Sequence, residues 1–249
     1  MFEKYITDEE VRKKLKELHE SKYELKSILD SQNNKSSFVI DICGLPRTGK
    51  TNTVSKLLTF FRKANYRVLS TKEPAEIIKE TEDSKLLTDK EFNDKTFDIS
   101  KHQLEILSDK KPDIILQDRG VFDNFIWYQM MYDKGELSDQ EYDRIIGLLP
   151  TVLSIDNIIY ILVGDSLEIV KRDYNYEITL EDRKKTTEEN IDNLRNSIKS
   201  LLQKIQNKDN IRIIDTTNLN ERDMAIIVAE DIINTMKKKY IKNHGIGLK

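Results

Sequence analysis

The sequence predicts an α/β fold in which a five-stranded, mostly parallel sheet lies between two layers of helices. From residue 38 onward, short runs that are apolar at their centres alternate with segments of helical periodicity. Strands that are apolar on both faces are typical of parallel sheets covered by helices on both sides. The five predicted strands span residues 38–43, 66–70, 113–117, 157–163 and 211–215.

Helical periodicity fills the segments between these strands. Apolar residues recur every three or four positions, as on the buried face of a helix. One predicted helix begins with a capping box formed by Ser138 and Glu141 and should end before Pro150. The main helices are predicted at 53–63, 138–149, 187–205 and 221–238.

A separate amphipathic helix is predicted ahead of the sheet, at residues 7–31. Thr7 and Glu10 have the spacing of a capping box, and leucines follow along one side. A polar linker, 31–37, separates this helix from the first strand. We expect the helix to pack against the body of its own subunit. Dimerisation, or binding of a partner, is the alternative.

The composition indicates a soluble, highly charged protein of 249 residues, with 34% charged residues and a formal net charge of −3. That charge gives no general attraction to nucleic acid. The sequence has neither an apolar signal core at its start nor an 18-residue apolar run, so we expect a cytoplasmic location without membrane contact. Cys43 is the only cysteine and lies in an apolar run, which predicts a small buried hydrophobe.

The first predicted strand leads into a phosphate-binding loop. The pattern G-x-x-x-x-G-K-[ST] is filled by Gly44, Gly49, Lys50 and Thr51. Such glycines let backbone N–H groups face phosphate oxygens, while the lysine reaches the β- and γ-phosphates and the threonine ligates Mg²⁺. Strand, loop and helix in this order predict a P-loop NTPase that binds ATP and Mg²⁺. The predicted nucleotide-binding residues are Gly44, Leu45, Pro46, Arg47, Thr48, Gly49, Lys50, Thr51 and Asn52.

Acidic residues follow the second and third predicted strands. Asp118 comes directly after an apolar run, where P-loop proteins place the acid that shares Mg²⁺ with the loop threonine, here Thr51. Arg119 follows at once. Glu73 lies just past the second strand. Because parallel strands end at the same edge of a sheet, Glu73 should lie within reach of the group that accepts a phosphoryl group.

Taken together, the phosphate loop, the segment Thr-Lys-Glu-Pro at 71–74 and the pair Asp118-Arg119 resemble thymidylate kinases and, more distantly, deoxynucleoside kinases. The resemblance implies transfer of the γ-phosphoryl group of ATP to a small acceptor, a nucleoside monophosphate or a nucleoside. The predicted division of the chain is a helix and linker at 1–35, a kinase domain at 36–240 with a lid near 172–186, and a basic tail at 241–249.

The resemblance also implies roles for individual residues. Phe97 would stack on the acceptor base and Lys101 would pair with it, while Gln129 belongs to a Tyr-Gln pair that the family places after Asp-Arg. Arg47 matches an arginine that clamps the transferring phosphate in one subgroup. The predicted catalytic residues are Lys50, Arg47, Asp118, Glu73, Arg172 and Arg183, and the predicted acceptor-site residues are Glu73, Phe97, Lys101, Arg119 and Gln129.

Arg172 and Arg183 are singled out because a mobile segment that brings an arginine onto the γ-phosphate would neutralise transition-state charge. The alternative is a solvated helix surface rich in ion pairs. Three departures from the family weaken thymidylate as the acceptor: Pro46 replaces a carboxylate, Lys101 an arginine, and Gly120 the aromatic residue after Asp-Arg.

The acceptor decides which side chain the chemistry needs. A monophosphate is already ionised and needs a cation such as Arg119, whereas a hydroxyl benefits from a carboxylate base, Glu73 or Asp118. The monophosphate is favoured because Arg119 directly follows the acid. The alternatives are a kinase of a non-nucleotide hydroxyl, such as a sugar or an antibiotic, and an ATP-dependent switch whose N-terminal helix docks a partner.

Overall fold

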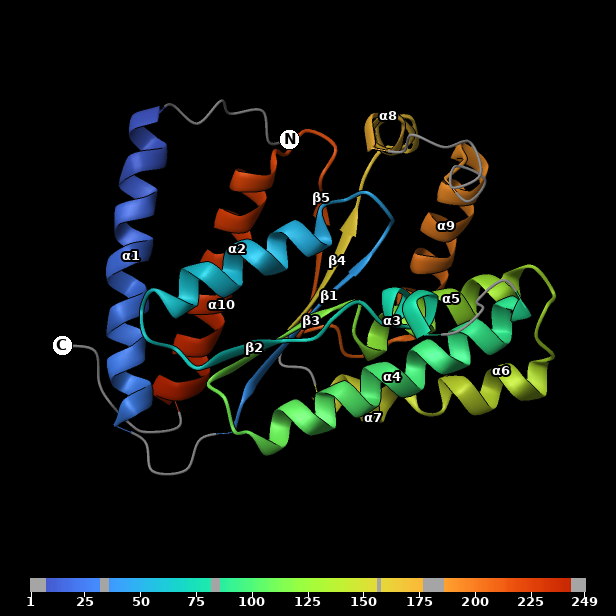
Figure 1. Ribbon diagram of the computed structural model, residues 1–249, viewed down its shortest axis with the longest axis horizontal. Coiled ribbons are helices and arrows are strands. Elements are labelled where there is room, and N and C mark those ends of the chain that lie inside the picture. Colours follow the sequence, from blue (N-terminus) through green and yellow to red (C-terminus); the bar gives the residue numbers. More distant parts are fainter. Residues whose placement is uncertain (1–7, 32–35, 82–85, 156–157, 177–185, 243–249) are drawn as a thin grey trace.

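A computed structural model describes residues 8–31, 36–81, 86–155, 158–176 and 186–242 (Figure 1). Its five strands form one sheet in the order β2-β3-β1-β4-β5, and every strand pairing is parallel. The predicted α/β class and all five strands are therefore confirmed. The strands are β1 (Phe38–Gly44), β2 (Val68–Ser70), β3 (Ile114–Asp118), β4 (Ile158–Val163) and β5 (Ile211–Asp215).

Helices cover both faces of the sheet. In Figure 1, α1, α2 and α10 lie on one side, and α4, α5, α6, α7 and α9 lie on the other. The helices are α1 (Asp8–Asp30), α2 (Lys50–Arg62), α3 (Pro74–Thr81), α4 (Asp89–Asp109), α5 (Val121–Asp133), α6 (Asp139–Ile146), α7 (Leu149–Ile155), α8 (Ser166–Tyr176), α9 (Glu188–Lys204) and α10 (Glu221–Lys242).

Alternate side chains of the strands fill two large apolar clusters. Ile40 and Ile42 of β1 pack with α2 and α10, whereas Cys43 packs with α5 and α9. Cys43 is fully buried, as predicted for a small hydrophobe. Because the central strands are covered on both faces, they read as nearly continuous apolar runs in the sequence.

The N-terminal helix α1 packs against α10 and the end of α2 of the same chain. Leu18, Leu25 and Leu29 are buried in the same cluster as the sheet and α10. Lys22, which interrupts this leucine series, is also buried: its Nζ donates to the Phe60 carbonyl at 3.2 Å and lies 4.2 Å from the Phe60 ring centroid. The lysine therefore continues the contact face, with its charge over an aromatic ring.

One predicted helix boundary is wrong. The capping box of Ser138 and Glu141 is present, but α6 ends at Ile146 and a new helix, α7, begins at Leu149. Pro150 therefore lies in the first turn of α7. Proline is tolerated there because its missing N–H would have no partner within the helix.

The other predicted capping residue, Thr7, lies outside the described residues. Within the described ranges, no helix is both long and apolar enough to cross a membrane.

Candidate active site

The phosphate loop connects the carboxyl end of β1 to the start of α2. Gly44 has φ of 109°, and a Cβ there would lie 2.4 Å from the carbonyl oxygen of Leu162 on β4. Gly49, the N-cap of α2, has φ of 85°. Glycine populates these dihedral angles at little cost, and at Gly44 the neighbouring strand also leaves no room for a side chain. The glycine spacing seen in the sequence thus has a direct structural cause.

Lys50 lies inside this loop. Its side chain is buried, and its Nζ donates a hydrogen bond to the carbonyl oxygen of Leu45 at 2.5 Å. Burial, followed by the charge of Arg119, lowers the pKa of Lys50 to about 7. The Lys50 amine, which the sequence predicts to bind phosphates, is therefore bound to a carbonyl oxygen of its own loop in this structure.

Thr51 and Asp118, the two predicted Mg²⁺ ligands, lie together. Asp118 ends β3 opposite Ile42 of β1, and its side chain is hydrogen-bonded by Thr51. Burial raises the pKa of Asp118, and the bond from Thr51 opposes that rise. The Oδ1 atom of Asp118 is buried and has no hydrogen-bond partner among the described residues. A hydroxyl beside an unpartnered carboxylate oxygen is a hard-oxygen donor set that fits Mg²⁺.

The segment before Glu73 is fixed from two sides. The backbone N–H of Asp118 donates to Thr71 Oγ1 at 3.0 Å. Gln103 of α4 accepts from the N–H of Lys72 at 2.9 Å and donates to its carbonyl at 3.1 Å. These bonds hold the chain beyond β2 against both β3 and α4, so Glu73 is brought to the carboxyl edge of the sheet where the sequence predicts it.

Arg119 lies at the centre of the site, with its side chain only 15% exposed. Its Nε lies 2.9 Å from Glu73 Oε1, an ion pair at an angle too oblique for a hydrogen bond. Its Nη1 donates to Asp123 Oδ2 at 3.0 Å and approaches the Gly44 carbonyl at 3.4 Å. Burial alone would lower the pKa of Arg119, but Asp123 and Glu73 together raise it.

Two buried aspartates that the sequence interpretation missed support this centre. Asp41, in the middle of β1, accepts hydrogen bonds from the backbone N–H groups of Gly120 at 2.9 Å and Phe122 at 3.2 Å. Asp123, in the first turn of α5, accepts from the N–H of Gly44 at 3.0 Å. The side chain of Asp41 on β1 therefore binds the start of α5, and the side chain of Asp123 on α5 binds the end of β1. A charged residue within an apolar strand was the available sequence signal for Asp41.

The predicted base-binding residues are only partly brought together. Phe97 of α4 is half-buried and packs edge-on against Phe125 at 5.9 Å and Tyr128 at 6.5 Å, which places it in an aromatic cluster between α4 and α5. Lys101 lies on the exposed side of α4, and its side chain is 63% exposed. Gln129 is buried and hydrogen-bonded to Asp133 and Tyr142, within the packing of α5.

Arg172 and Arg47 both interact with parts of the chain around the loop. Arg172 of α8 donates to the carbonyl oxygens of Thr216 at 2.8 Å and Thr217 at 3.0 Å, just after β5. Arg47, in the phosphate loop, forms an ion pair with Asp173 of α8. The third predicted arginine, Arg183, lies outside the described residues.

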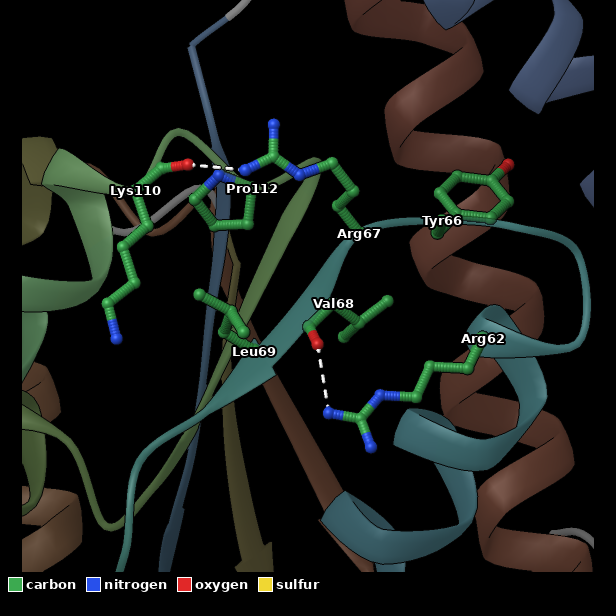
Figure 2. Close-up of a pocket in the computed structure, with 7 residues that line it drawn as sticks. All are labelled: Arg62, Tyr66, Arg67, Val68, Leu69, Lys110 and Pro112. Carbon is green, nitrogen blue, oxygen red and sulfur yellow. Dashed lines mark hydrogen bonds between the residues drawn. The ribbon is translucent and has the colours of Figure 1, made fainter.

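A hollow of about 390 Å³ lies away from this site, at the starts of β2 and β3 (Figure 2). Figure 2 shows two of its cations held by carbonyl oxygens: Arg67 donates to Lys110 and Arg62 donates to Val68. Arg62 ends α2 and Lys110 caps α4. Cations are favourable at helix C-termini, so this basic surface is accounted for by the fold itself.

Sheet order, phosphate loop and helical layers together define a P-loop α/β protein. No protein-family model matches the chain, and no curated protein matches its sequence. Solved structures do match it, and three of them are structures of deoxyadenosine kinase from M. mycoides.

The structure of that kinase with bound dATP matches with a TM-score of 0.57 and 16% identity, over 78% of this chain and 98% of that chain. Its structure with the products dCMP and a flexible dCDP gives 0.53 and 17%, over 80% and 100%. The dCTP-bound structure gives 0.52 and 16%, over the same shares. The chain therefore has the fold of P-loop deoxynucleoside kinases, one of the two groups that its motifs resemble.

Proposed function

We propose that the protein is an ATP-dependent kinase that phosphorylates a hydroxyl group of a nucleoside. The observation that carries this proposal is the ion-pair cluster of Glu73, Arg119 and Asp123 beside the phosphate loop. It sets a carboxylate at the edge of the sheet where acceptors bind in α/β folds. The fold likeness to a deoxyadenosine kinase supports a nucleoside as the acceptor.

The charges of the site favour a hydroxyl over the monophosphate that the sequence favoured. Arg119, the cation expected to bind a monophosphate, is already paired with two carboxylates. Lys50 and Arg119 face three acids in all, Glu73, Asp118 and Asp123. A dianionic acceptor would add repulsion to this cluster, whereas a neutral hydroxyl would not.

Glu73 is the base in this proposal. Its carboxylate would accept the proton of the acceptor hydroxyl as the oxygen attacks the γ-phosphorus of ATP, and the bond to the bridging oxygen of ADP would break. Arg119 is the positioning residue, because it holds the Glu73 carboxylate on one side and is itself fixed by Asp123 on the other.

The loop residues would neutralise the phosphates. The negative charge of ATP favours the protonated form of Lys50 and would draw its Nζ from the Leu45 carbonyl to the phosphate oxygens. Thr51 and Asp118 would hold Mg²⁺, which supplies further positive charge at the β- and γ-phosphates. The acceptor base would lie near Phe97, whose ring is half-buried, whereas its neighbours Phe125 and Tyr128 are buried behind it.

The test is transfer of labelled phosphate from ATP to deoxynucleosides, ribonucleosides and their monophosphates, followed by kinetics of two variants. With a nucleoside, Glu73→Gln should lower kcat by about 10²–10⁴-fold, the usual effect of losing a general base. Glu76→Gln is the matched control, since this exposed glutamate lies one turn further along in α3. Its kcat should remain that of the wild type.

Other outcomes would contradict the proposal in distinct ways. Labelling of monophosphates alone, with Arg119→Ala raising their KM and Glu73→Gln changing kcat little, would establish the monophosphate alternative. Slow ATP hydrolysis without any labelled acceptor, accelerated by a partner protein, would identify a switch instead of a kinase.

A further inference from the structure

Arg47 of the phosphate loop is tied to Asp173, a residue 126 positions later in the chain. The Nε of Arg47 donates to Asp173 Oδ1 at 2.5 Å. The two partners differ in exposure: the aspartate side chain is 4% exposed and the arginine side chain 33%. A buried carboxylate needs a compensating cation, and here that cation comes from the loop that would surround the phosphates.

Asp173 lies in a helix that is held in place by contacts other than the ion pair with Arg47. The neighbouring Arg172 binds the two carbonyl oxygens that follow β5, and Ile169, one turn earlier in α8, is fully buried. Helix α8 is therefore held at the carboxyl edge of the sheet independently of the loop. Arg47, in contrast, lies in an irregular segment with φ of 53°, in the left-handed region. The rigid partner of the pair is the aspartate.

Resting on the proposed function, we infer that Asp173 is a positioning residue that orients Arg47 toward the phosphoryl group in transfer. A hydrogen bond at Nε fixes the direction of the whole planar guanidinium group, including the Nη atoms at its far end. An arginine oriented before the nucleotide binds need not be ordered during the reaction, and its charge then acts at full strength on the transition state.

Charge alone predicts the opposite effect. A carboxylate close to the phosphate loop repels the triphosphate, so its neutralisation would strengthen ATP binding if the pair had no positioning role. Loss of orientation would weaken binding. The sign of the change in ATP affinity therefore separates the two possibilities, and it can be measured without any acceptor.

The experiment is a double-mutant cycle with Asp173→Asn and Arg47→Gln, measured as ATP dissociation constants by calorimetry and as kcat for phosphoryl transfer. Asp173→Asn should weaken ATP binding about tenfold and lower kcat by about 10²-fold, the cost of misplacing a reacting group by roughly 1 Å. In the Arg47→Gln background, Asp173→Asn should change neither value further. Asp173→Glu should restore part of the activity.

Asp231→Asn is the control, because Asp231 also forms a long-range ion pair, with Arg212 at 3.1 Å, outside the site. It should change neither ATP affinity nor kcat. Tighter ATP binding by Asp173→Asn would overturn the inference, and so would effects of the two substitutions that simply add. If the wild type phosphorylates no nucleoside, the proposed function fails, whereas the ATP-affinity cycle still decides the role of Asp173.

Discussion

Gly120 lies directly against the carboxylate of Asp41. The backbone N–H of Gly120 donates to Asp41 Oδ1 at 2.9 Å, and a Cβ on Gly120 would lie 2.6 Å from Asp41 Oδ2 and 2.8 Å from Gln117 Cδ. This contact explains a departure of the sequence from the thymidylate kinase pattern, in which an aromatic residue follows Asp-Arg. No side chain fits at this position beside the buried aspartate.

Gly120→Ala should destabilise the protein by about 1–3 kcal/mol, the usual cost of forcing an extra group into a packed interior. Neither neighbour can move freely, because Asp41 and Gln117 are both fully buried. Chemical denaturation measures the loss. Gly147→Ala is the matched control, since Gly147 has right-handed helical dihedral angles and its added Cβ would meet nothing closer than 3.3 Å. The control should cost less than Gly120→Ala, because its Cβ would lie 3.3 Å from a backbone carbonyl oxygen and not 2.6 Å from a buried carboxylate. Equal effects of the two substitutions would contradict this explanation.

Asp41 should make folding stability depend on pH. Burial raises its pKa from 3.8 to about 7, although two backbone N–H groups oppose the rise. The folded pKa lies above the unfolded one, so the protonated carboxyl contributes stability that is present below about pH 4 and lost as the pH rises through 7.

The unfolding free energy of the wild type minus that of Asp41→Asn should therefore fall between pH 4 and 7, by up to about 4 kcal/mol. Urea denaturation of both proteins across this range gives the difference directly, and effects of titrating groups that do not interact with Asp41 cancel. A difference that is constant with pH would show that Asp41 titrates near its unfolded value.

Lys50→Met should lower phosphoryl transfer by at least about 10²–10³-fold, because it removes a charge that acts on the transferring phosphate. Methionine keeps the buried stem. Since burial lowers the pKa of Lys50, loss of the amine should not lower the unfolding midpoint. Lys56→Met, an exposed position on the same helix, is the control for both measurements. Near wild-type turnover in Lys50→Met would refute the kinase assignment.

Leu25→Ala should test whether α1 is part of the folded body. Leu25 is fully buried against the cluster that contains the sheet and α10, so its truncation should cost about 2–5 kcal/mol. ATP binding by the folded fraction should persist, because the phosphate loop begins after the linker. Lys16→Ala, on the exposed side of α1, should change stability by less than about 0.5 kcal/mol. A small loss in Leu25→Ala would mean that α1 adds little to the core.

The regular elements could be predicted because their signals are local. Apolar runs mark β1, β3 and β4, whose residues are buried on both faces, and the capping box at Ser138 marks the start of α6. The end of α6 could not be predicted, because Pro150 is compatible both with a helix stop and with the first turn of α7. Local sequence does not distinguish these two uses of proline.

The site was predictable in its backbone and much less so in its side chains. The phosphate loop is a local pattern, and the parallel sheet brings Glu73 and Asp118 to one edge wherever the intervening helices lie. Lys101 and Gln129 carry no such constraint. Each has hydrogen-bonding groups that can be satisfied elsewhere, Lys101 by solvent and Gln129 by Asp133 and Tyr142.

The sequence by itself determined the α/β class, the phosphate loop and the order of strands and helices along the chain, because periodicity, glycine dihedral angles and strand burial act over a few neighbouring residues. Only the tertiary structure decided which charges meet: Arg119 with Glu73 and Asp123, Arg47 with Asp173, and Asp41 with the start of α5. Long charged side chains have many rotamers, so the local sequence does not fix their partners. A buried charge must pair with whichever opposite charge the tertiary structure places nearby.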